Sequence, residues 1–339
     1  MQVESTKALG NVLVTGGTGF IGSYLVKRLV EGGNRVRVLD NCVRRDVRRL
    51  GSYLDRIEYV EGDVVDSDRV LRVVEGIDTL FHLAFINGTE NFYRFPEKVL
   101  GVGVKGALNT LDAALRCDVK RYIVTSSSEV YQQPTRVPTP EDERIVIPDI
   151  KNPRFSYSGA KIITELLALH YPAKSKLETV ICRPHNVYGP DMGAAHVIPQ
   201  MILRMKDLSR DFSIREIELP IQGTGEETRA FCYIHDAVGE LIQCAVKGKN
   251  REIYHIGTEE EIAIRELAAR LAQLLGIRIS LKRSEGPLGG TTRRCPSIAK
   301  IRDLGFEPEW SLTDGLKETV AWYLRAEFKP QDERRETTG

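Results

Sequence analysis

Two segments of the sequence carry side chains that together could move a proton. Ser127 lies in the serine-rich run 125–131, and Tyr157 and Lys161 follow in a segment with helical periodicity. Tyrosine and lysine four positions apart share one face of a helix, and an adjacent ammonium favours tyrosinate. Tyr157 is therefore a candidate general base, and Ser127 would hold the substrate hydroxyl and polarise the carbonyl that it becomes. The competing interpretation is a chance spacing, with a surface tyrosine stacked on a lysine stem.

A glycine-rich turn near the start of the chain has the pattern of a dinucleotide-binding loop. Gly16, Gly19 and Gly22 lie between the β-branched run 11–15 and a helical pattern. Glycines at this spacing allow a tight turn, close approach of the backbone to a pyrophosphate and close packing of helix on strand, and the helix N-terminus supplies N–H groups. The alternative is a purely structural turn in an unrelated α/β fold.

Asp40, at the end of the second predicted strand, indicates which dinucleotide binds. Its carboxylate would accept hydrogen bonds from a ribose diol and repel the 2′-phosphate of NADP, so NAD is the predicted cofactor. Asp63 follows the third predicted strand, where it would either meet an adenine amino group or cap a helix. The other residues predicted to line the cofactor site follow these glycines and strands: Phe20, Ile21, Asn41, Val64, Leu83 and Ala84.

The elements that must position these residues alternate between short β-branched runs and helical patterns. This alternation predicts βαβ units, and hence an α/β fold with a Rossmann-type, doubly wound parallel sheet and a smaller C-terminal substrate-binding region. Helices are expected over residues 97–116, 156–170, 198–205 and 264–275, and another from residue 236. The NAD-binding domain is predicted at 10–183 with parts of 226–257, the discontinuous substrate-binding region at 184–225 and 258–326, and a frayed tail at 327–339.

Composition and charge narrow the functional classes. Lys and Arg number 48 and Asp and Glu 47, so the net charge of +1 gives no field that would attract nucleic acid. The six cysteines form no CxxC pair and the histidines no cluster with metal-ligand spacing, so we expect no metal site and free thiols in a reducing compartment. No apolar run is long enough for a membrane span, and no leader pattern opens the sequence. These features predict a cytoplasmic protein without membrane or nucleic-acid partners.

With the glycine loop, the serine run and the tyrosine–lysine pair in this order, the sequence resembles the extended short-chain dehydrogenase/reductase family. Within it, the resemblance is to the nucleotide-sugar epimerases, dehydratases and decarboxylases, and it covers residues 11–323. It implies a catalytic triad of Ser127, Tyr157 and Lys161, with Lys161 also touching the nicotinamide ribose. The expected substrate is a nucleotide-diphosphate sugar.

Three later segments are similar to substrate-binding motifs of this family. The resemblance implies that Asn186 in the run 183–190 meets the substrate diphosphate and that Arg229 and Arg294 reach the nucleotide phosphates. Arginine suits this task because its fork pairs with two phosphate oxygens. The sequence departs from the family pattern at Gly103, where an asparagine often holds a water, and at Gln132, where a glycine usually follows the tyrosine.

The resemblance implies a first step in which C4 of the sugar ring is oxidised by hydride transfer to NAD. The step that follows decides the reaction, and Glu129 is the residue that bears on it. The sequence resembles 4,6-dehydratases and uronic acid decarboxylases in placing a glutamate two positions after the catalytic serine. Ser128 stands where the best-known deoxyhexose dehydratases have an acidic aspartate, so the sequence matches a dTDP-glucose-type mechanism less well than a decarboxylase-like or GDP-mannose-type one. Elimination or decarboxylation assisted by Glu129 is narrowly favoured. The alternatives are a C4 epimerase of a UDP-hexose or UDP-uronic acid, a glutamate that only caps a loop, and an NAD-binding regulator without catalysis.

The helices predicted at 97–116 and 156–170 also point to a homodimer. Apolar residues fall on more than one face of them, namely Leu108, Leu111, Ile162, Leu166 and Leu169. Family members resemble this pattern in pairing the two helices across a two-fold axis as a four-helix bundle. Ordinary burial under the chain's own sheet is the competing explanation.

Overall fold

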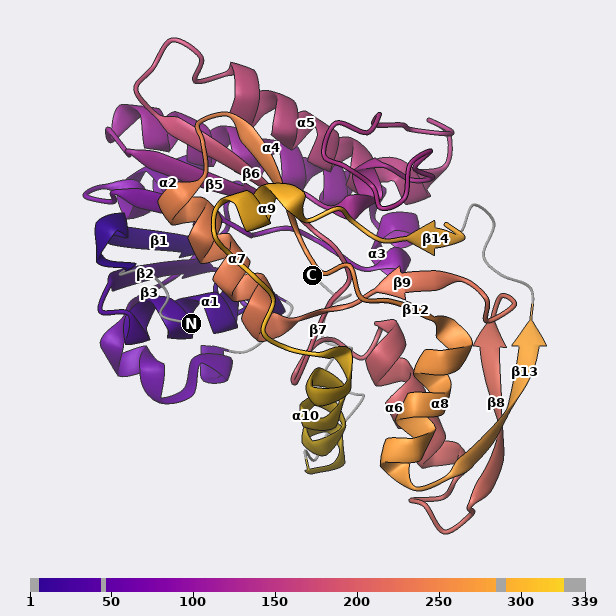
Figure 1. Cartoon of the computed structure of the whole chain (residues 1–339). Coiled ribbons are helices and arrows are strands. Elements are labelled where there is room, and N and C mark those ends of the chain that lie inside the picture. Colours follow the sequence, from indigo (N-terminus) through magenta and orange to yellow (C-terminus); the bar gives the residue numbers. More distant parts are fainter. Residues whose placement is uncertain (1–5, 44–46, 285–290, 326–339) are drawn as a thin grey trace.

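A computed structural model describes residues 6–43, 47–284 and 291–325 of the chain. Within these residues the largest element is a parallel sheet of seven strands (Figure 1). In their order across the sheet the strands are β11 (Glu252–Ile256), β6 (Glu178–Pro184), β5 (Arg121–Thr125), β4 (Thr79–His82), β1 (Asn11–Thr15), β2 (Arg35–Asp40) and β3 (Glu58–Glu61). The order reverses between β1 and β4, which is where open α/β sheets bind ligands.

Helices cover both faces of this sheet because successive side chains of each strand point to opposite faces and both sets are apolar. In β1, Val12 and Val14 pack with Leu25 on one face, and Leu13 packs with Leu111 on the other. The first face carries α1 (Phe20–Glu31) and α7 (Ile234–Lys247). The second face carries α2 (Ser67–Val74), α4 (Pro96–Arg116) and α5 (Ser156–His170).

A smaller group of elements stands away from the sheet (Figure 1). It contains α6 (Val197–Leu208), β8 (Glu216–Gln222), α8 (Ile264–Leu275), β13 (Arg278–Ser284) and, beside it, α10 (Leu312–Arg325). Alternate residues of β8, namely Ile217, Leu219 and Ile221, are buried, which is the pattern of a strand with one face in a core. None of the helices in the described ranges is both long and apolar enough to cross a membrane.

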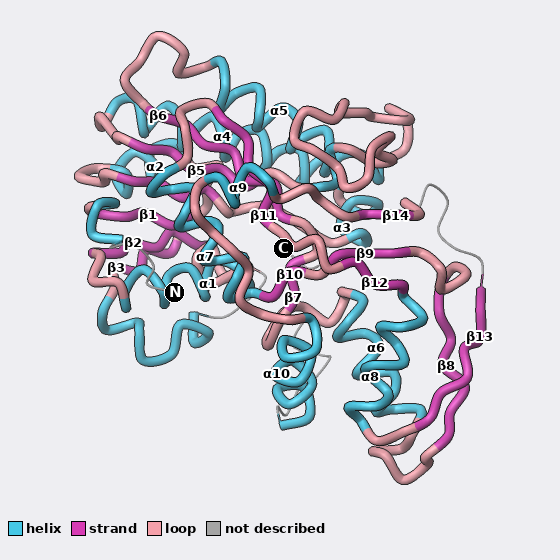
Figure 2. Tube along the Cα trace, viewed as in Figure 1, coloured by secondary structure: helices cyan, strands magenta, loops and turns pink. Residues whose placement is uncertain are grey.

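Short elements connect the two groups across the carboxyl ends of the sheet (Figure 2). The strand β9 (Thr228–Ala230) pairs with β12 (Glu261–Ala263) and with β14 (Arg293–Arg294). The other short elements are η1 (Thr6–Leu9), η2 (Val47–Arg56), α3 (Thr89–Arg94), η3 (Ser128–Val130), η4 (Pro153–Phe155), β7 (Val187–Tyr188), β10 (Cys232–Tyr233) and α9 (Ala299–Asp303).

The predicted fold class is confirmed, and the long helices begin and end close to the predicted positions. Sequence reasoning missed β13 and α3, whose apolar patterns are short or interrupted by charge. The domain boundaries remain a prediction, and the predicted tail at 327–339 lies outside the described residues.

Candidate active site

Three glycines keep the turn after β1 free of side chains and let it pack closely against neighbouring backbone. Gly16 has a φ of +73°, and a Cβ added there would lie 2.8 Å from the backbone nitrogen of Ala84. A Cβ on Gly22 would lie 2.1 Å from the carbonyl oxygen of Gly16. Gly19 precedes α1 without a side-chain cap, so the helix N-terminus presents its N–H groups and its positive dipole end to the turn. Phe20 and Ile21 form the first residues of that helix.

Asp40 and Asp63 lie at neighbouring strand ends and are fixed by hydrogen bonds. Asp40 accepts the N–H groups of Thr18 at 2.9 Å and Cys42 at 2.8 Å, which ties the end of β2 to the glycine turn. Asp63 accepts the side-chain amide of Asn41 at 2.8 Å. The cap of α2 is Asp66, so the alternative role of Asp63 as a helix cap is wrong.

The remaining predicted cofactor residues follow β3 and β4 along the same edge. The N–H of Leu83 donates to the carbonyl of Thr15 at 3.1 Å, and the N–H of Ala84 donates to the hydroxyl of the same threonine at 3.3 Å. Val64 is buried, and its carbonyl accepts the amide of Asn109 at 2.9 Å. A glycine turn without space for a Cβ at Gly16 or Gly22, an uncapped helix end and a fixed carboxylate at the neighbouring strand end together fit a dinucleotide.

The tyrosine–lysine pair lies on α5 against the end of β5. The ammonium of Lys161 is buried and donates to the carbonyl of Thr125 at 2.6 Å, two residues before Ser127. Burial lowers the pKa of Lys161 to about 7, and Glu165 opposes this shift. Ser127 caps η3 by accepting the N–H of Glu129 at 3.2 Å, and Ser128 is buried in that turn. The structure thus brings the predicted triad to one strand end.

Two phenylalanines that the sequence analysis missed enclose Tyr157. The Phe92 ring stacks on Tyr157 at 4.8 Å between centroids, and Phe85 meets it edge-on at 5.2 Å. The centroid of the Phe85 ring also lies 3.8 Å from the Lys161 nitrogen, within reach of a cation–π interaction. Gly103 makes the room, because a Cβ there would lie 2.4 Å from the Phe85 ring. The sequence departs from the family pattern here, with glycine in place of asparagine, and this departure was a sign of the aromatic contact.

Glu129 forms an ion pair that the sequence did not predict. Its carboxylate lies 2.7 Å from the guanidinium of Arg294, whose charge holds the pKa of Glu129 below its usual range. Arg154 and Arg229 act on Glu129 in the same direction. Because β14 pairs with β9, Arg294 is the direct register partner of Arg229. Glu129 is therefore ionised at neutral pH and surrounded by cations.

The predicted phosphate-binding residues lie beside this ion pair. Arg229 donates to the carbonyls of Thr228 at 2.7 Å and Thr291 at 2.8 Å, and burial lowers its pKa to about 10. Asn186 donates its amide to the carbonyl of Ala230 at 3.0 Å. The structure gathers Asn186, Arg229 and Arg294 at one place, and it directs the guanidinium of Arg294 to Glu129.

Arg154 is a further cation that sequence reasoning missed. It lies in η4, three residues before Tyr157, and its buried Nε has no hydrogen-bond partner among the described residues. A lone arginine before a tyrosine carries no sequence signal, so only the fold reveals it. Within the described ranges no group of three or more His, Cys, Asp or Glu residues is arranged to hold a metal ion.

Comparison with known proteins identifies the family of this chain. The model of the NAD dependent epimerase/dehydratase family matches residues 12–257. A UDP-N-acetyl-alpha-D-glucosaminuronate decarboxylase of Bacillus cytotoxicus is 32% identical over 327 residues, which cover 93% of this chain and 98% of the relative.

Two solved structures show the same architecture. A dTDP-glucose 4,6-dehydratase from Streptomyces venezuelae with NAD bound has a TM-score of 0.82 at 28% identity, covering 93% of this chain and 97% of that one. The UDP-glucose 4-epimerase from Thermotoga maritima also has a TM-score of 0.82 at 28% identity, covering 93% and 98%. The predicted resemblance is thereby confirmed: the chain belongs to the NAD-dependent epimerase/dehydratase family of extended short-chain dehydrogenases/reductases, and it is an enzyme that uses NAD.

Proposed function

We propose that this enzyme decarboxylates a nucleotide-diphosphate uronic acid, with UDP-glucuronic acid or its N-acetylglucosamine counterpart as the substrate. The observation that carries the proposal is the ionised Glu129 held by Arg294 and surrounded by Arg154 and Arg229. A substrate carboxylate needs such cations when it enters a site with little water. The decarboxylase of Bacillus cytotoxicus supports the same reaction class.

The proposed sequence begins with removal of the C4 hydroxyl proton by Tyr157, while Ser127 holds the oxygen and Lys161 stabilises the phenolate. Gly16, Gly19, Gly22 and Asp40 would hold NAD, which supplies the hydride acceptor when bound. Oxidation at C4 makes the uronic acid a β-keto acid. The C5–C6 bond then breaks, carbon dioxide leaves, its electron pair forms an enolate that Ser127 and Tyr157 stabilise, and C5 takes up a proton before the hydride returns to C4.

Ser128 favours decarboxylation over loss of water from C6. Dehydration needs an acid to protonate the departing hydroxyl, and the buried Ser128 is no such acid. Carbon dioxide leaves without a proton, so the site needs only cations to place the carboxylate and a group that controls protonation at C5. We assign the first task to Arg154 and Arg294 and the second to Glu129.

The test is a mass-spectrometric screen of UDP-, GDP-, CDP- and dTDP-sugars, with uronic acids included. We expect carbon dioxide and a UDP-pentose from a UDP-uronic acid. Solvent deuterium at C5 of a 4-keto-6-deoxyhexose would instead identify a 4,6-dehydratase, and exchange of C4 configuration without label or carbon dioxide would identify a C4 epimerase like that of Thermotoga maritima. Either outcome would overturn decarboxylation.

Glu129→Gln tests the residue assigned to the later step. We expect NADH to accumulate on this variant, because hydride transfer to NAD needs Tyr157 and not Glu129, while product formation falls about a hundredfold or more. Glu178→Gln is the matched control, since Glu178 also pairs with an arginine at 2.7 Å but at the amino end of β6. Equal product formation by wild type and Glu129→Gln would remove Glu129 from the mechanism.

We also propose that the enzyme is a cytoplasmic homodimer. The described cysteines are all free, which suits a reducing compartment. The helices α4 and α5 pack side by side on one face of the sheet and keep exposed apolar residues on their outer side. These helices are the proposed dimer contact.

A further inference from the structure

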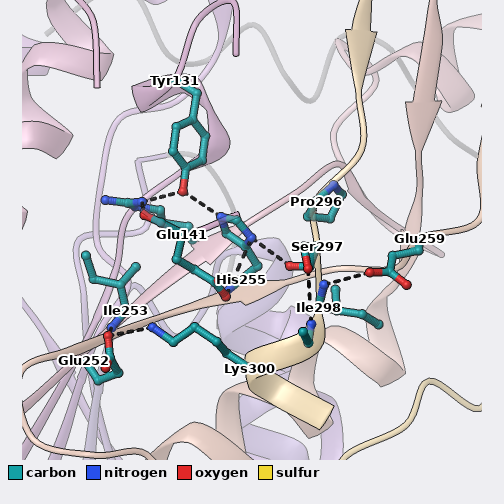
Figure 3. Close-up of polar contacts among 12 residues, drawn as sticks. Tyr131, Glu141, Glu252, Ile253, His255, Glu259, Pro296, Ser297, Ile298 and Lys300 are labelled. Carbon is teal, nitrogen blue, oxygen red and sulfur yellow. Dashed lines mark hydrogen bonds and ion pairs between the residues drawn. The ribbon is translucent and has the colours of Figure 1, made fainter. Parts of the chain in front are cut away.

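The Glu129–Arg294 ion pair joins two chain segments that also meet at a second place, around the buried side chain of His255. Tyr131 lies two residues after Glu129, and its hydroxyl is 2.7 Å from Nε2 of His255. Ser297 lies three residues after Arg294, and its carbonyl oxygen is 2.9 Å from Nδ1 of the same histidine. Figure 3 shows the imidazole between these two partners. His255 therefore bridges the two segments whose ends form the ion pair.

The chemistry of these partners fixes the direction of every hydrogen bond. A carbonyl oxygen can only accept, so Nδ1 of His255 carries the hydrogen and Nε2 accepts one. The hydroxyl of Tyr131 must then donate to Nε2, and it accepts from the guanidinium of Arg183. Arg183 is held in turn by Glu165, with nitrogen–oxygen distances of 2.8 and 2.6 Å. The chain of bonds admits only one tautomer of a neutral His255.

Burial keeps His255 neutral, although its hydrogen bond to Ser297 opposes the shift in its pKa. Burial lowers its pKa to about 3, and the nearby Arg183 and Lys300 add to this effect. Glu141 faces the ring as well, with a carboxylate oxygen 3.7 Å from Nδ1, and the neighbouring His185 ring lies 4.6 Å away between centroids. The pKa of Glu141 is itself raised by burial. The bridge is therefore held by two directional hydrogen bonds, and a rigid bond of this kind fixes position better than a mobile ion pair.

We infer that His255 is a positioning residue that sets the geometry of the Glu129–Arg294 pair by tying Tyr131 to Ser297. The inference rests on the proposed function in placing Glu129 after the first hydride transfer. Other bonds keep the Arg294 segment folded without His255: the N–H of Thr139 donates to the carbonyl of Cys295 at 2.8 Å, and the N–H of Ser297 donates to the carbonyl of Thr139 at 2.7 Å. Substitution of His255 should therefore change alignment and leave the fold intact.

The experiment follows bound NADH and product during turnover of UDP-glucuronic acid by the NAD-loaded full chain. In His255→Phe we expect NADH to accumulate and product formation to fall about tenfold, with the initial rate of NAD reduction within about twofold of wild type. His255→Gln can still accept from Tyr131 and His255→Asn can still donate to Ser297, so each should recover part of the loss. Tyr131→Phe should resemble His255→Phe, and it serves if the latter fails to fold.

Lys300→Ala is the matched control. It removes a 2.6 Å ion pair to Glu252 that also ties this segment to β11, and it leaves the Tyr131–His255–Ser297 bonds in place (Figure 3). Unchanged NADH and product in His255→Phe, or an equal loss in Lys300→Ala, would overturn the inference. If wild type releases no carbon dioxide, the proposed function fails. The role of His255 is then tested with the sugar nucleotide that does reduce bound NAD. Accumulation of NADH in His255→Phe supports the inference, and no accumulation of NADH overturns it.

Discussion

At the scale of single residues, burial decides the chemistry of the triad. Lys161 is buried under Phe85 and against the end of β5, where its ammonium has lost water and gained the carbonyl of Thr125. Because surroundings with little water screen charges weakly, the ammonium of Lys161 would act more strongly on a nearby negative charge there than in water.

Replacing Tyr157 with Phe tests the proton acceptor directly. In the proposed mechanism the phenol acts on the sugar, while its ring packs between Phe85 and Phe92, so Tyr157→Phe should keep the ring contacts and NAD affinity. We expect turnover to fall at least about a hundredfold. Steady-state kinetics and NAD titration by calorimetry measure the two quantities. Turnover within about tenfold of wild type would exclude Tyr157 as the base.

Lys161→Met tests the cost of burying the ammonium. The pKa of Lys161 is about 7 in the folded protein against an ordinary value of 10.5, so between these pH values the unfolded chain binds a proton that the folded chain does not. The free energy of unfolding of wild type should therefore rise across this window by at most about 1.4 kcal/mol per pH unit relative to Lys161→Met. Urea unfolding of both proteins at about pH 7 and pH 9 measures the difference. A difference that stays constant with pH would contradict a depressed pKa.

At the scale of elements, local patterns predicted what lies within one element and missed what joins two. The spacing of Tyr157 and Lys161 and the order of strand, glycine turn and helix are properties of short segments, and both were predictable. The contact of Glu129 with Arg294 depends on how β14 pairs with β9 and where η3 meets them, and no periodicity encodes that register. The Phe85 contact was missed because the ring occupies the space beside Gly103 of α4, and a residue without a side chain adds nothing to an apolar pattern.

Two of the three glycines of α4, Gly101 and Gly103, offer a matched test of the Phe85 contact. A Cβ on Gly103 would lie 2.4 Å from the Phe85 ring, whereas a Cβ on Gly101 has no neighbour within 4 Å. Alanine favours a helix interior over glycine by about 0.5–1 kcal/mol at both sites. We expect Gly101→Ala to raise the melting temperature with activity unchanged, and Gly103→Ala to lower both the melting temperature and turnover by displacing the ring. Equal behaviour of the two variants in calorimetry and kinetics would show that Phe85 does not need this space.

At the scale of the whole molecule, the active site depends on contacts between distant parts of the chain. The seven-stranded sheet supplies the cofactor turn and the triad, and the segments after Pro184 supply Asn186, Arg229 and Arg294. Arg49 adds another connection, since it donates to Asp191 at 2.6 Å and to the carbonyl of Thr18 in the glycine turn at 3.1 Å. Arg49 thus joins the glycine turn to the segment after Pro184 through its side chain.

The outer side of α4 and α5 leads to a prediction about assembly. Leu166 is 52% exposed, and Ile163 on the same helix and Leu100 on α4 are each 39% exposed, although residues on the inner side of both helices are fully buried. An apolar strip on two adjacent helices is the surface that a two-fold four-helix bundle would cover.

We expect a dimer of wild type at about micromolar concentration in analytical ultracentrifugation. We expect a monomer of Leu166→Glu, because the new carboxylate would be buried without a partner in the dimer. Leu274→Glu is the control, since Leu274 is a similarly exposed leucine on α8 and should leave the dimer intact. A wild-type monomer at this concentration, or a dimer that survives Leu166→Glu, would assign the contact to another surface.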